Sequence, residues 1–387
     1  MLSTLLAGLI AMQVIAPGAA SGAAPAQAAT PETAISQLGS FDFQTRTAAA
    51  ALLRRRPAAD VVPLLETAAR GHDDEYVRYR ALVLLSGIDT GAMTRVAADL
   101  LSDPNDRVRT VVYQWFERQP RPEMTPRLIA ALNREASEFV RPALLRALAA
   151  AGDTPQIREI LEPLVFRGDD LFRGSVIVAL GDHGRTFAVD EIRQVAALDG
   201  PLQDDAVTAL GRIGDKSVLP DISALQKDGP RQLQPTVSAA LCLLGVDCEA
   251  RLTFVSDTLR FAATAPDRLD LLRGSVHAAG VLARSGHAGI FETMVDAALR
   301  SDGAARDTLT LGVGTVILRN PDVALELYEA RQLAPEIGAL YLDAFDMLAE
   351  EFDKEQFGAA IRRVLWTSPE GSPRRQSASA LLDALEF

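Results

Sequence analysis

The sequence predicts an all-α protein, a right-handed α-α superhelix (an α-solenoid) built from antiparallel helix pairs. Three observations lead to this fold class. A short motif recurs at nearly constant spacing along most of the 387 residues, and apolar residues follow a helical period after each copy. The composition, 48% hydrophobic but only 5% aromatic, favours helices that pack through small side chains.

The first 28 residues predict a cleavable signal peptide. Residues 1–31 carry no charged side chain, residues 5–15 form a short apolar run, and "PAQA" at 25–28 supplies small residues before a cleavage point at Ala29. The start "MLST" lacks the usual basic residues, so either the start codon is placed too late or the segment is a disordered Ala/Pro tail rather than a signal peptide. We expect a periplasmic or secreted protein without stable membrane insertion after cleavage, and a disordered linker over residues 29–39.

The recurring motif is an acidic residue followed three positions later by an arginine, as in "EYVR", "DRVR", "EFVR" and "DLFR". With the arginine as the zero position, successive copies are 30 to 32 residues apart, except for a last step of 39. The acidic residue suits the N-cap or first turn of a helix. Glutamine replaces arginine at Gln203 and Gln234, where a bend, a contact site or sequence drift are alternatives. We expect the arginines to be structural joints that tie a helix to the neighbouring turn: Arg46, Arg78, Arg109, Arg141, Arg173 and Arg273.

Each zero position predicts the start of the second helix of a pair. Positions +3, +4 and +7 are apolar, as in Leu144, Leu145 and Leu148, and therefore share one helix face. These helices end at turns such as "SGID" and "LGDHG". An apolar first helix precedes each one, over residues 61–71, 93–103 and 124–134 for example. Neither helix can bury its apolar face alone, so the pairs must stack.

The regular array is expected over residues 40–320. Residues 321–387 are helical in pattern but out of register, which predicts degenerate repeats and a C-terminal cap.

This pattern resembles the HEAT-repeat family, particularly the short bacterial repeats of phycobilisome lyase-like proteins. The family signature D-P-D-x-x-V-R corresponds to "DPNDRVR" at 103–109, and the resemblance covers residues 40–320. It implies an armadillo-type fold and a scaffold for protein–protein interaction. The alternative is an enzyme or enzyme-accessory protein, lyase-like or metal-dependent, built on the same body.

We predict no catalytic, cofactor-binding or metal-binding residue and no cofactor. The iron-dependent hydroxylases of this fold use His-Glu pairs, whereas the 4 histidines here precede Asp73, Gly184, Ala278 and Ala288. His277 lies at a core position of its helix and is expected to be packed and hydrogen-bonded. The net charge of −12 argues against a nucleic-acid partner.

The 2 cysteines, Cys242 and Cys248, lie on either side of the turn at Gly245. A chain that reverses at this glycine can bring the two Cα atoms within disulfide range, so we predict a Cys242–Cys248 disulfide, which would agree with export. The alternative is two unrelated thiols in the core.

The second helices are expected to line the inner face of the curve with positions +2, +5 and +9. Several of these residues are arginines, which suits an extended or carboxylate-bearing protein or peptide partner. The alternative is that they are ordinary solvated residues. The candidate partner-binding residues are Arg80, Gln114, Arg118, Arg146, Asp205 and Arg212.

Overall fold

The computed structural model describes residues 30–264, 266–348 and 351–387, and this part of the chain contains helices and no strand. The predicted all-α solenoid is confirmed. The predicted signal peptide, residues 1–28, lies outside the described residues. Among the described helices, none is both long and apolar enough to cross a membrane.

The described α-helices are numbered in chain order. Short 3-10 turns lie at Pro122–Met124, Glu162–Val165, Thr186–Ala188, Lys216–Val218, Arg231–Leu233 and Pro266–Arg268. The α-helices are α1 Pro31–Gln37, α2 Phe43–Arg55, α3 Ala58–Gly71, α4 Glu75–Ile88, α5 Thr90–Asp99, α6 Asp106–Arg118, α7 Thr125–Leu132, α8 Arg141–Ala151, α9 Pro155–Leu161, α10 Asp170–Asp182, α11 Val189–Ala196, α12 Gln203–Ile213, α13 Leu219–Asp228, α14 Gln234–Leu243, α15 Cys248–Ala262, α16 Leu269–Arg284, α17 Ala288–Arg300, α18 Gly303–Arg319, α19 Pro321–Ala330, α20 Pro335–Met347, α21 Glu351–Thr367 and α22 Pro373–Ala384.

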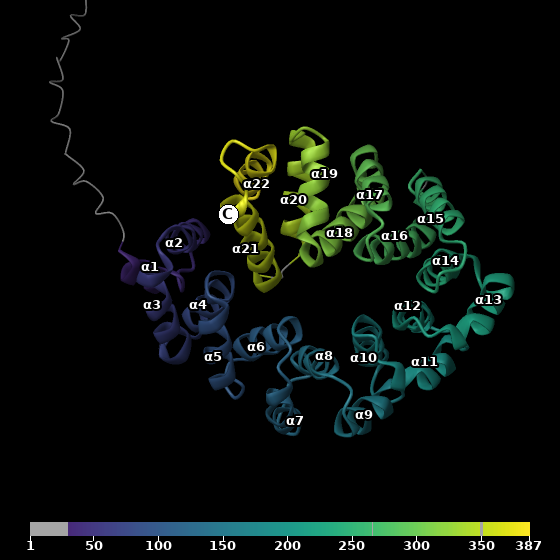
Figure 1. Cartoon of the computed structure of the whole chain (residues 1–387), viewed down its shortest axis with the longest axis horizontal. Coiled ribbons are helices and arrows are strands. Elements are labelled where there is room, and N and C mark those ends of the chain that lie inside the picture. Colours follow the sequence, from purple (N-terminus) through teal and green to yellow (C-terminus); the bar gives the residue numbers. More distant parts are fainter. Residues whose placement is uncertain (1–29, 265, 349–350) are drawn as a thin grey trace, which may run out of the picture.

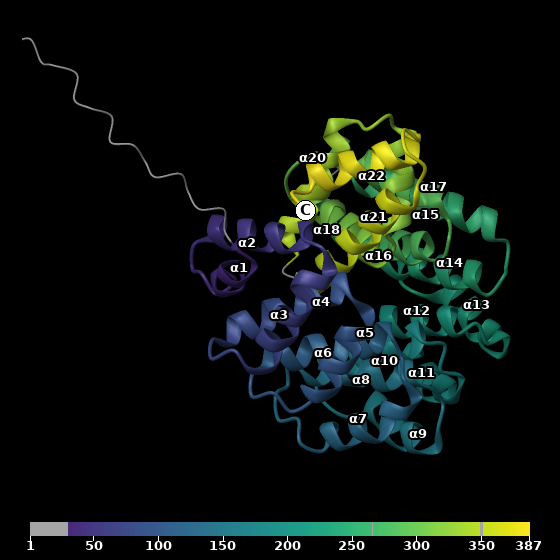
Figure 2. The ribbon, with the colours of Figure 1, turned by 60° about the vertical axis from the view of Figure 1, so that its left-hand side comes forward.

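The helices form two layers that curve into a ring (Figures 1 and 2). The inner layer consists of α4, α6, α8, α10, α12, α14, α16 and α18, each packed against the next, and α21 joins α18 back to α4. The outer layer follows the first helices of the pairs, from α3 through α17 (Figure 1). The solenoid is therefore closed, and its first and last helices are neighbours.

Helix α1 corrects the prediction of a disordered linker over residues 29–39. The side chain of Thr30 caps this helix by accepting a hydrogen bond from the Thr33 amide, and Pro31 occupies the first turn. Ala34 and Leu38 are fully buried in the core. A capped, amphipathic segment of this kind is part of the fold, which begins at residue 31 rather than near residue 40.

The second helices begin as the motif predicts, with one refinement. In α2, α4 and α10 the N-cap is the residue four positions before the zero position, namely Asp42, Asp74 and Asp169, whose carboxylate accepts a first-turn amide hydrogen bond. The acidic residue of the motif lies in the first turn instead, where Asp106 pairs with Arg109 at 2.6 Å. The residue four positions before the arginine therefore caps the helix, and the acidic residue three positions before it pairs with the arginine side chain.

Four of the motif arginines donate hydrogen bonds to the turn that precedes their own helix. The Arg109 guanidinium also binds Glu135 in the next turn, at 2.8 Å, and Glu135 raises the pKa of Arg109. A buried turn carbonyl needs a donor, and the arginine side chain supplies it. The four bonds to carbonyl oxygens are Arg46 to Ser40 at 2.9 Å, Arg78 to His72 at 2.9 Å, Arg109 to Asp103 at 2.8 Å and Arg173 to Val165 at 3.0 Å.

The two glutamines that break the arginine pattern make the same kind of joint. Gln203 Nε2 donates to the Ala196 carbonyl at 3.0 Å, and Gln234 Nε2 donates to the Gly229 carbonyl at 3.1 Å. A side-chain amide supplies the N–H that the turn requires without a charge. The repeat is therefore continuous through these positions.

Two of the predicted joint arginines, Arg141 and Arg273, do not bind a turn carbonyl. The Arg141 guanidinium lies over the Phe172 ring, 5.5 Å from its centroid. Arg273 is exposed, and in the described part of the chain its ion-pair partner is Asp270 of its own helix, at 3.0 Å. The predicted joint role is wrong at these two positions, where the guanidinium groups have the other partners just described.

Inner helices approach one another through glycine. A Cβ atom on Gly181 would lie 2.6 Å from the Ala209 Cα, and one on Gly211 would lie 2.7 Å from the Ala240 Cα. No side chain larger than hydrogen fits at either glycine. The small residues foreseen from the composition therefore set the spacing of α10, α12 and α14.

The buried apolar side chains form two clusters that meet at both ends. One extends over residues 34–244 and the other over residues 239–385. Phe352 of α21 is only 2% exposed, yet it belongs to the first cluster, because α21 packs on α4. The C-terminal segment, predicted as degenerate repeats with a cap, also closes the ring.

A buried carboxylate lies at this closure. The Glu355 side chain is 1% exposed and accepts hydrogen bonds from Arg54 of α2 at 2.6 Å and from Arg362 at 2.6 Å. Beside it, Gln356 Nε2 donates to Ser86 Oγ of α4 at 2.8 Å. Gly87 leaves the space for Glu355, since a Cβ there would collide with the carboxylate.

Replacing Glu355 with alanine is expected to open the ring. Two buried guanidinium groups would lose their shared carboxylate, which costs about 3–5 kcal/mol. We expect chemical denaturation to show this loss of stability and small-angle scattering to show a larger radius of gyration. Glu326→Ala is the control, because the Glu326 side chain is 61% exposed. Unchanged stability and scattering in Glu355→Ala would contradict the closure.

Candidate interaction site on the inner face of the ring

Charged side chains gather where the inner helices end, and we call them the central cluster. Four of the arginines lie in the last turn of α6, α12, α16 or α18, where the negative end of the helix dipole favours a cation. The cluster consists of Glu117, Arg118, Arg146, Asp182, Arg212, Arg284, Arg319 and Asp353.

Glu117 connects three neighbours in this cluster. Its carboxylate accepts a hydrogen bond from Arg146 at 2.6 Å and lies 3.6 Å from His183 Nε2 and 3.7 Å from Arg319. Burial alone would raise the pKa of Glu117, but His183, Arg146 and Arg319 together hold the pKa well below its usual value. Glu117 is therefore a buried anion that depends on its cationic neighbours.

Asp182 and Asp353 extend the network in two directions. Asp182 contacts Arg146 at 2.8 Å and also Arg212, so one carboxylate is shared between two guanidinium groups. Asp353 of α21 contacts Arg118 at 2.5 Å and Arg319 at 3.7 Å. The second set reaches across the ring closure and links α6 and α18 to the C-terminal segment.

Arg284 has no carboxylate partner among the described residues. Its Nε donates only to the Gly280 carbonyl, at 3.4 Å. Burial, and after it the charges of Arg319 and Arg146, lower the pKa of Arg284 to about 10. Burial and the charges of Arg284 and Arg146 likewise lower the pKa of Arg212 to about 10. These guanidinium groups lie close enough to repel one another.

The cluster carries more positive than negative charge. Five arginines face three carboxylates, in a chain whose net charge is −12. The side chains of Arg118 and Arg319 are 22% and 34% exposed, so solvent reaches part of the cluster. An arrangement of this kind can accept a further carboxylate, because the guanidinium forks are partly desolvated and incompletely paired.

Three of the predicted partner-binding residues, Arg118, Arg146 and Arg212, belong to the central cluster. Arg80 lies apart from it, donating to the Leu38 carbonyl at 2.7 Å and contacting Glu351 at 3.8 Å near the ring closure. Gln114 is half-buried on α6.

Asp205 does not face the partner surface as predicted. Its carboxylate packs against Gly174 of the neighbouring inner helix, where a Cβ would lie 2.9 Å from Oδ2. Close packing of α10 and α12 turns this position into the helix interface. Burial, with a smaller contribution from Asp204, raises the pKa of Asp205 to about 6.

The prediction of the site missed five of its members. Glu117 and Asp182 occupy positions +8 and +9 of their repeats, and Arg284 occupies +11. A count of charges in the last turn of every second helix would have found these three. Arg319 and Asp353 lie beyond the regular register, and no repeat position identifies them.

His277 is packed and hydrogen-bonded, as expected for a core position. Its Nε2 lies 3.0 Å from Thr208 Oγ1 of α12. Burial lowers the pKa of His277, so the neutral imidazole is favoured.

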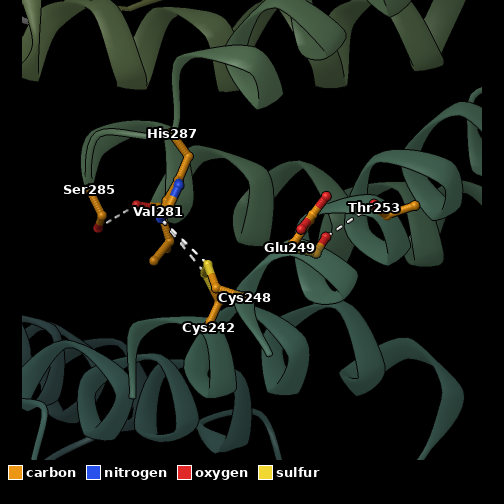
Figure 3. The surroundings of a disulfide bond; sticks show 7 residues. All are labelled: Cys242, Cys248, Glu249, Thr253, Val281, Ser285 and His287. Atoms are coloured by element: carbon orange, nitrogen blue, oxygen red, sulfur yellow. Dashed lines mark hydrogen bonds between the residues drawn. A yellow bond between two sulfur atoms is a disulfide. The ribbon is translucent and has the colours of Figure 1, made fainter. Parts of the chain in front are cut away.

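Cys242 and Cys248 lie side by side at the junction of α14 and α15 (Figure 3). Their Cα atoms are 4.1 Å apart and their sulfur atoms lie at bonding distance. His287, just before α17, points its Nε2 at both sulfur atoms, at 3.7 and 3.8 Å. The sequence predicted that the two cysteines lie close together. Nothing in the sequence indicated that the histidine 39 residues further on would contact them.

Comparison with known proteins supports the repeat assignment. The family model of HEAT repeats matches residues 31–115, so the predicted resemblance is confirmed there. No curated protein matches the sequence.

Several solved structures match this chain at low identity and with TM-scores below 0.5. A C-terminal fragment of the cohesin loader SCC2 from Chaetomium thermophilum has 14% identity and a TM-score of 0.31, covering 92% of this chain and 35% of the fragment. A chain from a structure of the interaction between cadherin and beta-catenin has 12% identity and a TM-score of 0.33, over 92% and 83% of the two chains. Importin beta has 11% identity and a TM-score of 0.35, over 91% and 57%. This chain thus spans about a third of the cohesin loader fragment.

Replacing Asp205 with asparagine is expected to stabilise the protein at neutral pH. The folded state raises the pKa of Asp205 to about 6, so stability is full below the ordinary pKa near 4 and falls as the pH rises from about 4 to 6. The asparagine should recover about 2–3 kcal/mol at pH 7 and nearly nothing at pH 4. Denaturant unfolding at both pH values measures this, with exposed Asp73→Asn as the control. An equal effect of Asp205→Asn at both pH values would rule out titration as the cause.

Proposed function

We propose that this protein is an exported scaffold that binds a carboxylate-bearing segment of a protein partner on the inner face of the ring. A solenoid of HEAT repeats is a fold typical of protein-interaction scaffolds. The observation that carries the binding part of the proposal is the charge excess of the central cluster, and above all Arg284, which lacks a carboxylate partner among the described residues. The proposal of export rests on the sequence of residues 1–28 and on the cysteine pair.

The chemistry of the cluster favours a carboxylate ligand. A guanidinium group presents a planar fork of donors that matches a carboxylate in a bidentate manner. Within the chain, Glu117 accepts two hydrogen bonds from Arg146 on one carboxylate oxygen, and Asp182 accepts one more from the same guanidinium group. A glutamate or aspartate of a partner would complete the same pattern at Arg284 and Arg319.

A nucleic acid suits the cluster less well. Three carboxylates lie among the arginines and would repel a phosphate backbone, whose charge repeats along the whole strand. The chain as a whole carries −12 and would repel it too. A short acidic segment meets only the local excess of positive charge.

Binding should be measurable with a fluorescent glutamate-rich peptide, by anisotropy at low and physiological ionic strength. Arg284→Gln removes an unpaired charge without breaking an ion pair among the described residues, and should raise the Kd at least about tenfold, as expected for a lost charge-assisted hydrogen bond. Arg300→Gln, in the last turn of outer helix α17, is the matched control and should leave the Kd unchanged.

Two results would contradict the proposal. One is equal loss of peptide binding in Arg284→Gln and Arg300→Gln, which would indicate nonspecific attraction. The other is a single-stranded oligonucleotide that binds as tightly as the peptide at the same ionic strength.

Export has its own test in the mature N-terminus and the thiols. Protein purified from its native host is expected to begin near Ala29, because of the small residues at 26 and 28. In an oxidising compartment Cys242 and Cys248 should form a disulfide, so alkylation should find no free thiol until the protein is reduced. An intact N-terminus together with two readily alkylated thiols would contradict export.

A further inference from the structure

We propose that Cys242, Cys248 and His287 form a binding site for a thiophilic divalent metal ion such as Zn²⁺, open only when the two cysteines are reduced. The three side chains offer two sulfur atoms and one imidazole nitrogen, all within 4.8 Å of one another. This donor set is a known zinc-binding set, in which a fourth position stays free for water or another ligand.

The geometry around the histidine fits such a site. Zn–S bonds of about 2.3 Å and a Zn–N bond of about 2.0 Å place S and N about 3.5 Å apart in a tetrahedral centre. The distances from His287 Nε2 to the two sulfur atoms are 3.7 and 3.8 Å. Nε2 of the half-buried His287 points toward the two sulfur atoms (Figure 3). Once reduced, the sulfur atoms need only separate by rotation about their Cα–Cβ bonds to admit an ion.

The backbone that carries the ligands is held on both sides. The turn after Cys242 is closed by a hydrogen bond from the Val246 amide to the Leu241 carbonyl, at 2.9 Å, with Gly245 at φ +82°. The segment before His287 is closed in the same way, by its own amide bonded to the Leu282 carbonyl at 3.2 Å. Two helix ends that contain glycine thus fix the backbone of Cys242, Cys248 and His287. The three side chains therefore converge on one point without a bound ion.

The surroundings allow an ion to enter and favour its charge. Cys242 is 5% exposed, whereas Cys248 and His287 are half-buried. A cavity of about 420 Å³ lies against His287 and extends along Thr253 and Asp257 of α15, so solvent reaches the histidine side of the site. Cys248 is the first residue of the long helix α15, whose positive end favours a thiolate. Two thiolates neutralise a divalent ion, so the bound site carries no net charge.

The reaction has two balanced steps. A phosphine or dithiol reductant supplies two electrons and two protons take part, which breaks the S–S bond and leaves two thiols. The ion then binds both sulfur atoms and the lone pair of His287 Nε2, and the two thiol protons are released to solvent. The oxidised pair has no thiolate to offer, so oxidation closes the site.

The test uses the full-length protein, reduced with a phosphine and freed of metal, and titrated with Co²⁺ without oxygen. We expect a thiolate-to-cobalt charge-transfer absorption that saturates at one ion per chain and disappears when Zn²⁺ displaces Co²⁺. The oxidised protein should give no such absorption. His287→Gln keeps both thiols and should weaken Co²⁺ binding by more than about tenfold. His72→Gln, which changes another turn histidine, is the matched control.

Each outcome decides the proposal. Absence of the absorption in reduced wild-type protein would overturn the site, and equal Co²⁺ affinity in His287→Gln and wild type would remove the histidine from it. Equal binding by oxidised protein would overturn control by the cysteines. Circular dichroism of His287→Gln and Cys248→Ser, each compared with wild type, separates loss of a ligand from loss of fold.

Discussion

The contact between α21 and α4 is the constraint on which the rest of the structure depends. At this contact one buried carboxylate, Glu355, joins guanidinium groups from the two ends of the chain. An open solenoid exposes two terminal faces and an accessible inner curve. Closure removes the terminal faces and places the inner helices around a common centre. Charged side chains that would be solvated in an open array therefore lie close enough to interact electrostatically.

Part of the central cluster is a consequence of this closure. Arg319 meets Glu117, and Arg118 meets Asp353, because the two ends of the inner layer come together. The ion pairs of Arg146 and Asp182 join successive inner helices and need only their stacking. Arginines in the last turns of inner helices are individually favourable, because each faces the negative end of a helix dipole. Brought to one centre, they lose water and repel one another, and the pKa of Arg284 falls to about 10. Glu117, Asp182 and Asp353 offset part of this cost. The positive charge that they leave uncompensated is the basis for binding an external carboxylate.

Local features of the structure could be predicted closely. The spacing of the motif located the second helices and most of the joints, since a helix start and a turn carbonyl six residues earlier are set by neighbouring residues. Glutamine at Gln203 and Gln234 looked like a break in the pattern, yet it supplies the same hydrogen bond. Helix α1 was missed because its turn-forming start, Thr30-Pro31, lies outside the repeat register.

The sequence by itself determined the helix pairs, their order and the cysteine pair, because each depends on residues close together in the chain. Only the tertiary structure decided that the ring closes, which arginines meet at its centre, and that His287 faces the two sulfur atoms. These features depend on the small rotation between successive repeats, added over the whole inner layer. That sum is set by contacts such as those of Gly181 and Gly211 with the next helix, and no repeat pattern reveals it.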